Sequence, residues 1–320
     1  MKKNLIKILA ITLVVFMIAV IAASCTSDEK DNSDIEDILE DLLTDDTVKE
    51  QDDTKGDDTD DTETDAPAQS SGEALYGLED VVIYEDDNCM FRIDNVTNDD
   101  FWDSKLFNVT LENKTSDKEL GFSIGDVCVN GCMLPTLFLE NVEAGKTQTA
   151  DFDLAIDDKT GDPQEIIIDI TISDYNDFFG EPIVKDTFTI YTDGYDASNV
   201  KYPERVTTDN EKVVVDTDEY TVVVLGIEEG WGIPTLELYF ENKTDKDVNF
   251  NVDDVKINGK DYTAYSGTDV TAGHFAYESA SFDGDDIDGT PDKYEFTIKI
   301  SDADELWGDP FFEEECTFEP

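Results

Sequence analysis

The pentapeptide Leu111-Glu112-Asn113-Lys114-Thr115 recurs as Phe240-Glu241-Asn242-Lys243-Thr244, an offset of 129 residues (240 minus 111). The agreement continues at an offset of 128 (250 minus 122), where Phe122, Asp126, Asn130, Gly131, Ile170, Ile172, Ser173 and Asp174 match Phe250, Asp254, Asn258, Gly259, Ile298, Ile300, Ser301 and Asp302. Agreement along a whole domain length indicates a tandem duplication. We expect one domain at 75–194, a second at 212–320, and a linker at 195–211 between them.

Each copy shows the periodicity of β structure. Phe107, Val109 and Leu111 alternate with polar residues, and Leu236, Leu238 and Phe240 alternate with Glu237, Tyr239 and Glu241. This period of two predicts strands with one face in the core and one face in water. It returns in the series from Ile166 to Ile172 and from Tyr294 to Ile300.

The turn residues complete the fold prediction. Asn130-Gly131 and Asn258-Gly259 each lie between apolar runs, as in the two-residue turns of β-hairpins. About seven short strands in about 110 residues predict an all-β fold, namely two tandem immunoglobulin-like antiparallel β-sandwich domains. A small barrel is the alternative.

Several segments of the second copy also resemble a known group of proteins. They are Glu241-Asn-Lys-Thr-Asp-Lys-Asp-Val-Asn-Phe250, Asp254-Val-Lys-Ile-Asn-Gly259, Ala272-Gly273 and Ile300-Ser-Asp302. They resemble the uncharacterised tandem immunoglobulin-like domains of lipoproteins from Gram-positive bacteria. The resemblance implies an extracytoplasmic surface domain, and it implies no activity and no functional residue.

The N-terminus is typical of an export signal. Lys2, Lys3 and Lys7 precede an uncharged apolar stretch, and small residues lead up to Cys25. We expect a lipoprotein signal peptide at 1–24, because Ala22-Ala23-Ser24-Cys25 resembles a lipobox. Cys25 is then the lipidated residue, and the protein is anchored in the cell membrane on its extracytoplasmic face. An ordinary cleavage site and an uncleaved membrane helix are the alternatives.

Residues 25–74 are rich in Asp, Glu, Thr and Ser, and we expect a disordered acidic tether there. Over the whole chain, 79 acidic residues against 22 basic ones give a net charge of −57. Such a surface repels nucleic acid and suits cations, cationic peptides and solubility.

Nothing in the sequence forms a catalytic signature, so we expect no enzyme. His274 is the single histidine, and we predict that it is an exposed turn residue. The expected function is non-catalytic, either binding of an unidentified extracellular protein or glycan, or a structural role. A carbohydrate-binding or hydrolytic cell-wall protein is the alternative.

We expect no cofactor apart from one candidate Ca²⁺ site in the acidic turn of Asp302, Asp304 and Glu305, because carboxylate oxygens are the ligands that Ca²⁺ prefers. Asp and Asn are also the usual turn formers. Cys128 and Cys132 flank a tight turn and are either a disulfide or two separate buried thiols. Trp102, Trp231, Phe179 and Trp307 are either core residues or exposed binding residues.

Overall fold

A computed structural model of the chain describes residues 75–99, 104–177, 180–205, 207, 210–230, 233–282, 287, 291–305 and 308–320. The signal peptide predicted at 1–24 and the tether predicted at 25–74 lie outside these described residues. The first described element is the 3₁₀ turn Leu75–Gly77. Residues 68–320, which include both copies, form one compact unit.

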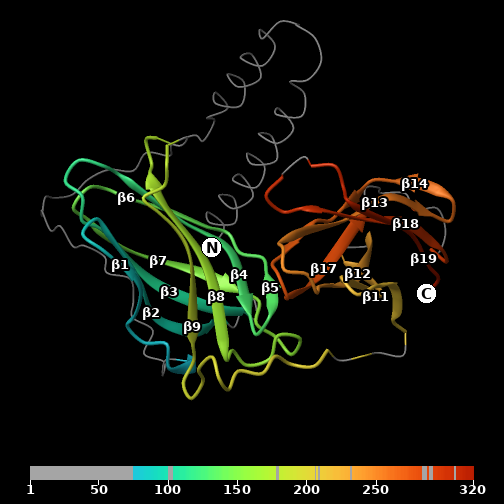
Figure 1. Cartoon of the computed structure of the whole chain (residues 1–320), viewed down its shortest axis with the longest axis horizontal. Coiled ribbons are helices and arrows are strands. Elements are labelled where there is room, and N and C mark those ends of the chain that lie inside the picture. Colours follow the sequence, from blue (N-terminus) through green and yellow to red (C-terminus); the bar gives the residue numbers. More distant parts are fainter. Residues whose placement is uncertain are drawn as a thin grey trace, which may run out of the picture. The chain divides into compact units, whose positions relative to one another are not determined.

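The first copy (repeat 1) contains nine strands among its described residues (Figure 1). They are β1 (Val81–Glu85), β2 (Cys89–Asp99), β3 (Ser104–Asn113), β4 (Leu120–Val129), β5 (Cys132–Leu134), β6 (Phe138–Val142), β7 (Thr147–Leu154), β8 (Glu165–Asp174) and β9 (Val184–Tyr191). One sheet has the order β1-β2-β3-β7. The other runs β5-β4-β8-β9, with β6 also paired to β4.

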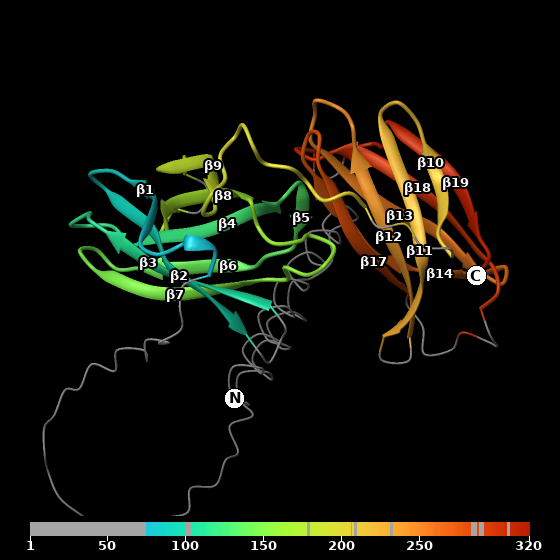
Figure 2. The ribbon, with the colours of Figure 1, turned by 90° about the horizontal axis from the view of Figure 1, so that it is seen from below.

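The second copy (repeat 2) contains ten strands among its described residues, coloured from yellow through orange to red (Figure 2). They are β10 (Lys212–Asp216), β11 (Tyr220–Gly230), β12 (Ile233–Asn242), β13 (Val248–Ile257), β14 (Lys260–Tyr262), β15 (Ala264–Tyr265), β16 (Thr268–Val270), β17 (Phe275–Phe282), β18 (Tyr294–Asp302) and β19 (Phe312–Phe318). The sheet orders repeat those of repeat 1, as β10-β11-β12-β17 and β14-β13-β18-β19.

The order of connections is that of an immunoglobulin-type sandwich. In repeat 1, β2, β3 and β7 hold the places of strands A, B and E, and β4, β8 and β9 hold those of C, F and G. Pairing within each repeat is antiparallel throughout the described strands, for example in the registers β3 to β7 and β12 to β17. The predicted all-β fold of antiparallel sandwiches is therefore confirmed.

The core of each repeat lies between its two sheets. Phe138 of β6 makes edge contacts with Phe91 and Phe152 of the opposite sheet, at centroid distances of 6.0 and 5.6 Å. In repeat 2, Phe250 of β13 stacks on Phe240 of β12 at 4.7 Å. Burying one such side chain contributes about 2–3 kcal/mol, and the alternating residues predicted for the core are buried in both copies.

A buried asparagine closes the same turn in both repeats. The side-chain amide of Asn113 donates to the carbonyls of Lys118 and Val142, at 2.8 Å each. Asn242 donates in the same way to Lys246 and Val270, at 2.7 and 2.9 Å. These bonds satisfy main-chain carbonyls that the strands leave unpaired, which explains why the Glu-Asn-Lys-Thr motif is the clearest mark of the repeat.

The predicted hairpin turns are also present. Asn130 and Gly131 have φ values of 51° and 84°, and Asn258 and Gly259 have 51° and 79°. Two consecutive positive φ values define the primed turn that Asn-Gly favours. The first turn joins β4 to β5 and the second joins β13 to β14.

The two repeats share a sheet. β5 of repeat 1 lies parallel to β17 of repeat 2, with Cys132 opposite Phe275 and Met133 opposite Ala276. The main-chain N–H of Phe275 donates to the carbonyl of Gly131 at 2.9 Å. Cys128 and Met133 accordingly pack into the core cluster of repeat 2. We call residues 131–133 together with 271–277 the joint.

The segment predicted as a linker packs against both repeats. The Tyr202 hydroxyl donates to Glu165 Oε2 at 2.7 Å, and the Lys201 N–H donates to Gln164 Oε1 at 3.0 Å. Arg205 forms a bidentate pair with Glu211 of the same segment at 2.6 and 2.9 Å. Its guanidinium lies 5.1 Å from the ring centroid of Tyr239 in repeat 2. The described part of the segment is therefore ordered against the sandwiches, and the division into domains 75–194 and 212–320 stays a prediction of the sequence.

Candidate functional site

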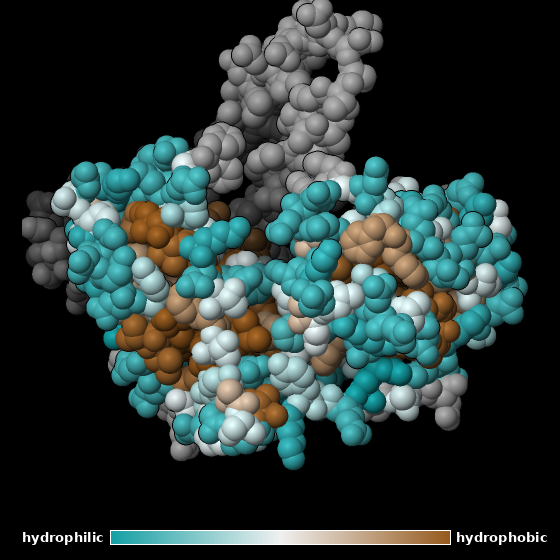
Figure 3. All heavy atoms as spheres, in the orientation of Figure 1, coloured by the Kyte–Doolittle hydropathy of each residue, from teal (hydrophilic) through white to brown (hydrophobic). Residues whose placement is uncertain are grey.

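The predicted anchor Cys25 lies outside the described residues, as do Trp102, Phe179, Trp231 and Trp307. Within the part of the chain that the structure describes, no helix has the length and apolarity needed to cross a membrane. Figure 3 shows a described surface that is largely hydrophilic, with some apolar residues over repeat 1.

The acidic turn after β18 is held by its own backbone. The Asp304 N–H donates to Asp302 Oδ1 at 3.0 Å, and the Glu305 N–H donates to the Asp302 carbonyl at 3.2 Å. This is the way in which Asp shapes a turn without a metal. Among the described residues, no three His, Cys, Asp or Glu side chains are grouped to hold a metal ion. The Ca²⁺ site at Asp302, Asp304 and Glu305 stays a prediction.

The cysteines of the described chain are all buried and free. Cys128 and Cys132 are therefore separate thiols, and the alternative of a disulfide between them is wrong. Burial raises the pKa of Cys132 to about 12 and that of Cys89 to about 12. Thiols held in the neutral form are poor nucleophiles, so these side chains serve packing.

The prediction that His274 is exposed is wrong. The ring is half-buried in the joint, its Nδ1 lies 2.7 Å from Thr271 Oγ1, and its centroid lies 6.2 Å from that of Tyr202. Burial lowers the pKa of His274. Thr271 Oγ1 also lies 3.2 Å from the sulfur of Met133, so this corner of repeat 2 is occupied by contacts with repeat 1.

Three aromatic rings lie together on β12 and β17, on the side of the sheet away from the core of repeat 2. The centroid of Tyr239 lies 5.6 Å from that of Phe275 and 5.3 Å from that of Tyr277. We call these three residues the aromatic face. The sequence pattern predicts that Tyr239 is in water, but only 6% of it is exposed, because it is covered from outside its own repeat.

Two cations cover the aromatic face. Lys159 of repeat 1 places its ammonium 5.1 Å from the centroid of Tyr277. Arg205 of the linker places its guanidinium 5.1 Å from the centroid of Tyr239. A cation over the face of an aromatic ring is attracted by the ring quadrupole, by about 0.5–2 kcal/mol. The aromatic face thus holds positive groups on both of its tyrosine rings.

A cleft of about 1020 Å³ adjoins this face. Its lining includes Tyr277, the apolar Leu225 and Ile227, the cation Lys159, and five acidic residues, namely Asp158, Glu204, Glu228, Glu237 and Glu319. Burial raises the pKa of Glu237, while a hydrogen bond from Ser279 Oγ at 2.7 Å opposes that effect. With five carboxylates against one ammonium, the cleft carries a net negative charge.

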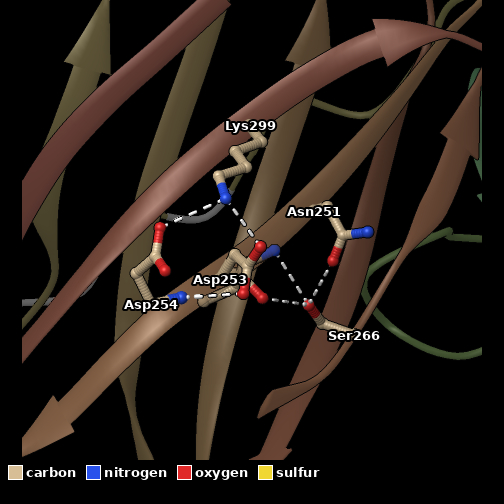
Figure 4. A network of polar contacts seen from close by, with 6 residues as sticks. Asn251, Asp253, Asp254, Ser266 and Lys299 are labelled. Carbon is tan, nitrogen blue, oxygen red and sulfur yellow. Dashed lines mark hydrogen bonds and ion pairs between the residues drawn. The ribbon is translucent and has the colours of Figure 1, made fainter. Parts of the chain in front are cut away.

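A second acidic region lies at a bulge of β4. Burial raises the pKa of Asp126 to about 6, and the negative charges of Asp269, Asp169 and Asp247 add to the effect, two of them from repeat 2. At the equivalent bulge of repeat 2, a lysine pairs with the carboxylates instead (Figure 4). There Lys299 Nζ lies 2.7 Å from Asp253 Oδ2 and 3.1 Å from Asp254 Oδ2. The two copies therefore differ at this bulge, which in repeat 1 lies near two acidic residues of repeat 2.

One carboxyl group points toward the core. Glu278 of β17 lies in the row that contains the buried Ala276 and Ala280, and it is opposite Leu238 of β12. Burial raises its pKa to about 7, and the nearby Glu237 contributes, although the Ser279 N–H donates to the carboxylate. Glu278 is thus a carboxylic acid at a position of β17 whose neighbours in the same row, Ala276 and Ala280, are buried and apolar.

The aromatic face was not predicted from the sequence, although the repeat contains a signal for it. The positions of Tyr239, Phe275 and Tyr277 are held in repeat 1 by Thr110, Thr147 and Thr149. Three threonines on the outer face of the sheet in repeat 1 thus correspond to three aromatic rings in repeat 2. Three aromatic rings on one outer side of a sheet indicate that this side is covered or binds a ligand.

No protein-family model matches the chain, and no curated protein matches it. Solved structures that resemble it include the YadV chaperone, with 13% identity over 67% of this chain and 92% of that chain at a TM-score of 0.21. A conserved domain protein from Bacillus anthracis has 10% identity over 78% and 95%, at a TM-score of 0.23. The exo-chitosanase CsxA from Amycolatopsis orientalis has 12% identity over 71% of this chain and 26% of that chain, at 0.21. TM-scores this low carry no argument about function, and the fold assignment rests on the strand pairing.

Proposed function

We propose that the protein is an extracytoplasmic lipoprotein, held to the membrane through Cys25, whose paired sandwiches form a non-catalytic binding module. The proposed binding site is the cleft beside the aromatic face, and the proposed partner is a cationic segment of an extracellular peptide or protein. The observation that carries the proposal is the ammonium of Lys159 over Tyr277 in a cleft with five carboxylates.

The position of Lys159 supports the chemistry of the ligand. An ammonium at a tyrosine ring is stabilised by the ring and by carboxylates within a few ångströms. The positive charge of Lys159 lowers the pKa of Glu237, whereas burial raises it. The ammonium and this carboxylate therefore attract each other. The cleft lining contains one lysine and five acidic residues, so its negative charge is only partly balanced. A peptide with several lysine or arginine side chains would supply the remaining positive charges.

The test is isothermal titration calorimetry of the full chain in detergent with an oligolysine peptide. We expect Glu237→Gln to weaken binding about tenfold, equivalent to about 1.4 kcal/mol. Glu313→Gln is the matched control, because it removes the same charge from an exposed position on β19. Equal weakening by the two variants would mean that the peptide responds only to overall charge, and the cleft would then be excluded as its site.

The alternative of a glycan ligand is tested in the same experiment. Sugars stack on exposed aromatic rings, and because they are uncharged, their binding depends little on salt concentration. Tyr277→Ala should weaken either ligand, whereas Glu237→Gln and added salt should weaken the peptide alone. Saturable binding of a cell-wall glycan that is unaffected by salt, together with no binding of oligolysine, would replace the cationic ligand by a carbohydrate.

A further inference from the structure

The joint combines a hairpin of repeat 1 with a strand edge of repeat 2. The hairpin supplies Gly131, Cys132 and Met133, and the edge is the beginning of β17. Cys132 is 1% exposed and Met133 is 6% exposed. The Tyr277 N–H points to the Cys132 sulfur, which adds to the main-chain bond from Phe275 to Gly131. Small and apolar side chains therefore allow the two backbones to pair.

Duplication gives the chain a second hairpin of the same kind. The turn of Asn258 and Gly259 has nearly the same φ values as its counterpart, and it leads into β14, the last strand of its sheet. Here the positions of Cys132 and Met133 are held by Lys260 and Asp261, which are both exposed. The hairpin keeps its backbone shape, but its tip carries two opposite charges.

Duplication also gives the chain a second strand edge. β7 of repeat 1 corresponds to β17, and among the described strands it ends its sheet with β3 as its neighbour. The positions of His274, Phe275 and Tyr277 are held in repeat 1 by Lys146, Thr147 and Thr149. All three of these residues are exposed, and none provides a ring that could cover a docked hairpin.

We propose that these replacements, at the hairpin and at the β7 edge, confine joint formation to contacts within one molecule. The hairpin at 258–261 of one molecule then does not pair with the β7 edge of another. Docking of this kind is heterologous, and repeated docking would build an open filament of molecules. Placing Lys260 and Asp261 where Cys132 and Met133 lie would remove two charges from water. Charged residues at strand edges are a common protection against edge-to-edge association. The partner that this surface excludes is a second copy of the chain.

The test places joint residues at the unused positions of the full chain, with alanine as a small, unreactive substitute for the cysteine. One variant carries Lys260→Ala and Asp261→Met at the hairpin, and another carries Lys146→His, Thr147→Phe and Thr149→Tyr at the β7 edge. A third variant combines all five changes. Sedimentation velocity in detergent should show oligomers that grow with protein concentration for the combined variant alone. An equimolar mixture of the first two variants should stop at a dimer, because each molecule then offers a single functional surface.

Monomeric behaviour of the folded combined variant, with its circular dichroism and melting temperature unchanged, would overturn the proposal. Head-to-tail oligomers of the unaltered chain would overturn it as well. The natural joint supplies a reverse test if the combined variant fails to fold. Cys132→Lys with Met133→Asp should open the joint and speed proteolysis within residues 195–211, and an unchanged rate of cleavage would contradict the idea that these side chains decide the contact.

Discussion

The duplication offers a matched pair of glycines for a test of the joint. Gly131 and Gly259 occupy the same turn position, with φ values of 84° and 79°. An added Cβ at Gly259 would meet nothing within 4 Å, whereas at Gly131 it would lie 2.6 Å from Cδ2 of Tyr202. Gly131→Ala and Gly259→Ala therefore impose the same backbone strain, and they differ in the contact with the linker.

The expected magnitudes follow from these distances. Alanine at positive φ costs about 1–2 kcal/mol at either site. At Gly131 the ring of Tyr202 must also move, although its hydroxyl is bonded to Glu165 and its ring lies near His274. Overpacking of this kind costs about 1–3 kcal/mol more. Gly131→Ala should accordingly lower the free energy of unfolding by about 2–5 kcal/mol.

The assay is urea unfolding of the full chain, followed by circular dichroism, for both glycine variants with and without Tyr202→Ala. In the Tyr202→Ala background the extra loss at Gly131 should disappear, which a double-mutant cycle reports as a coupling energy. The loss at Gly259 should be the same in both backgrounds. If Gly131→Ala and Gly259→Ala cost the same with Tyr202 present, the linker is not seated on the turn, and the reasoning about an ordered joint fails.

Three further predictions concern a buried acid, a buried amide and the anchor. The pKa of Glu278 is raised from 4.5 to about 7, so its ionised form destabilises the fold above pH 7 and this loss vanishes below pH 4.5. Glu278→Gln should therefore raise the free energy of unfolding by about 1–2 kcal/mol at about pH 8, allowing for partial solvation, and by much less at about pH 5; equal gains in urea titrations would refute the assignment. Asn242→Ala should cost about 2–3 kcal/mol in the same assay, because buried carbonyls lose their donor, and a loss below that of Thr244→Ala would contradict this role. Cys25→Ala should release the protein from the membrane fraction or leave its precursor uncleaved, and unchanged fractionation and processing would exclude lipidation.

The strands and the hairpin turns could be predicted because their signals are local. Alternation at Phe107, Val109 and Leu111 reports which face is buried, whatever the rest of the chain does. The Asn-Gly pairs report positive φ within two residues. The duplication strengthens each of these inferences, because the same alternation and the same Asn-Gly pair occur in both copies. These features depend on neighbours along the sequence, and they are the ones that the structure confirms.

The joint could not be predicted, because it depends on which outer surfaces meet. Tyr239 alternates with core residues and was therefore predicted to lie in water, yet Arg205 of the linker covers it. His274 follows a Gly in a turn and looks exposed until the hairpin of repeat 1 is in place. Both residues lie outside the core of their own repeat. The periodicity of a strand shows which side faces that core, but it does not show whether another repeat covers the other side.

The site was predictable in its charge but not in its location. The excess of acidic residues indicates cationic partners for the surface as a whole, and it does not distinguish Glu237 from an exposed residue such as Glu313. The sequence predicts a Ca²⁺ site in the acidic turn at Asp302 because the carboxylates of this turn are close in sequence. The acids of the cleft are scattered in sequence and come together only through the contact of repeat 1, the linker and repeat 2.

The short parallel pairing of β5 with β17 has a mechanical consequence. Two residue pairs join the repeats in register, whereas β11 and β12 within repeat 2 pair through ten. A pull between the N-terminal end of repeat 1 and a ligand held by repeat 2 would load this short pairing before it strained either sandwich. The connection would then give way first under tension, leaving both folds intact and the linker to carry the load, and relaxation would let the same two strands meet again.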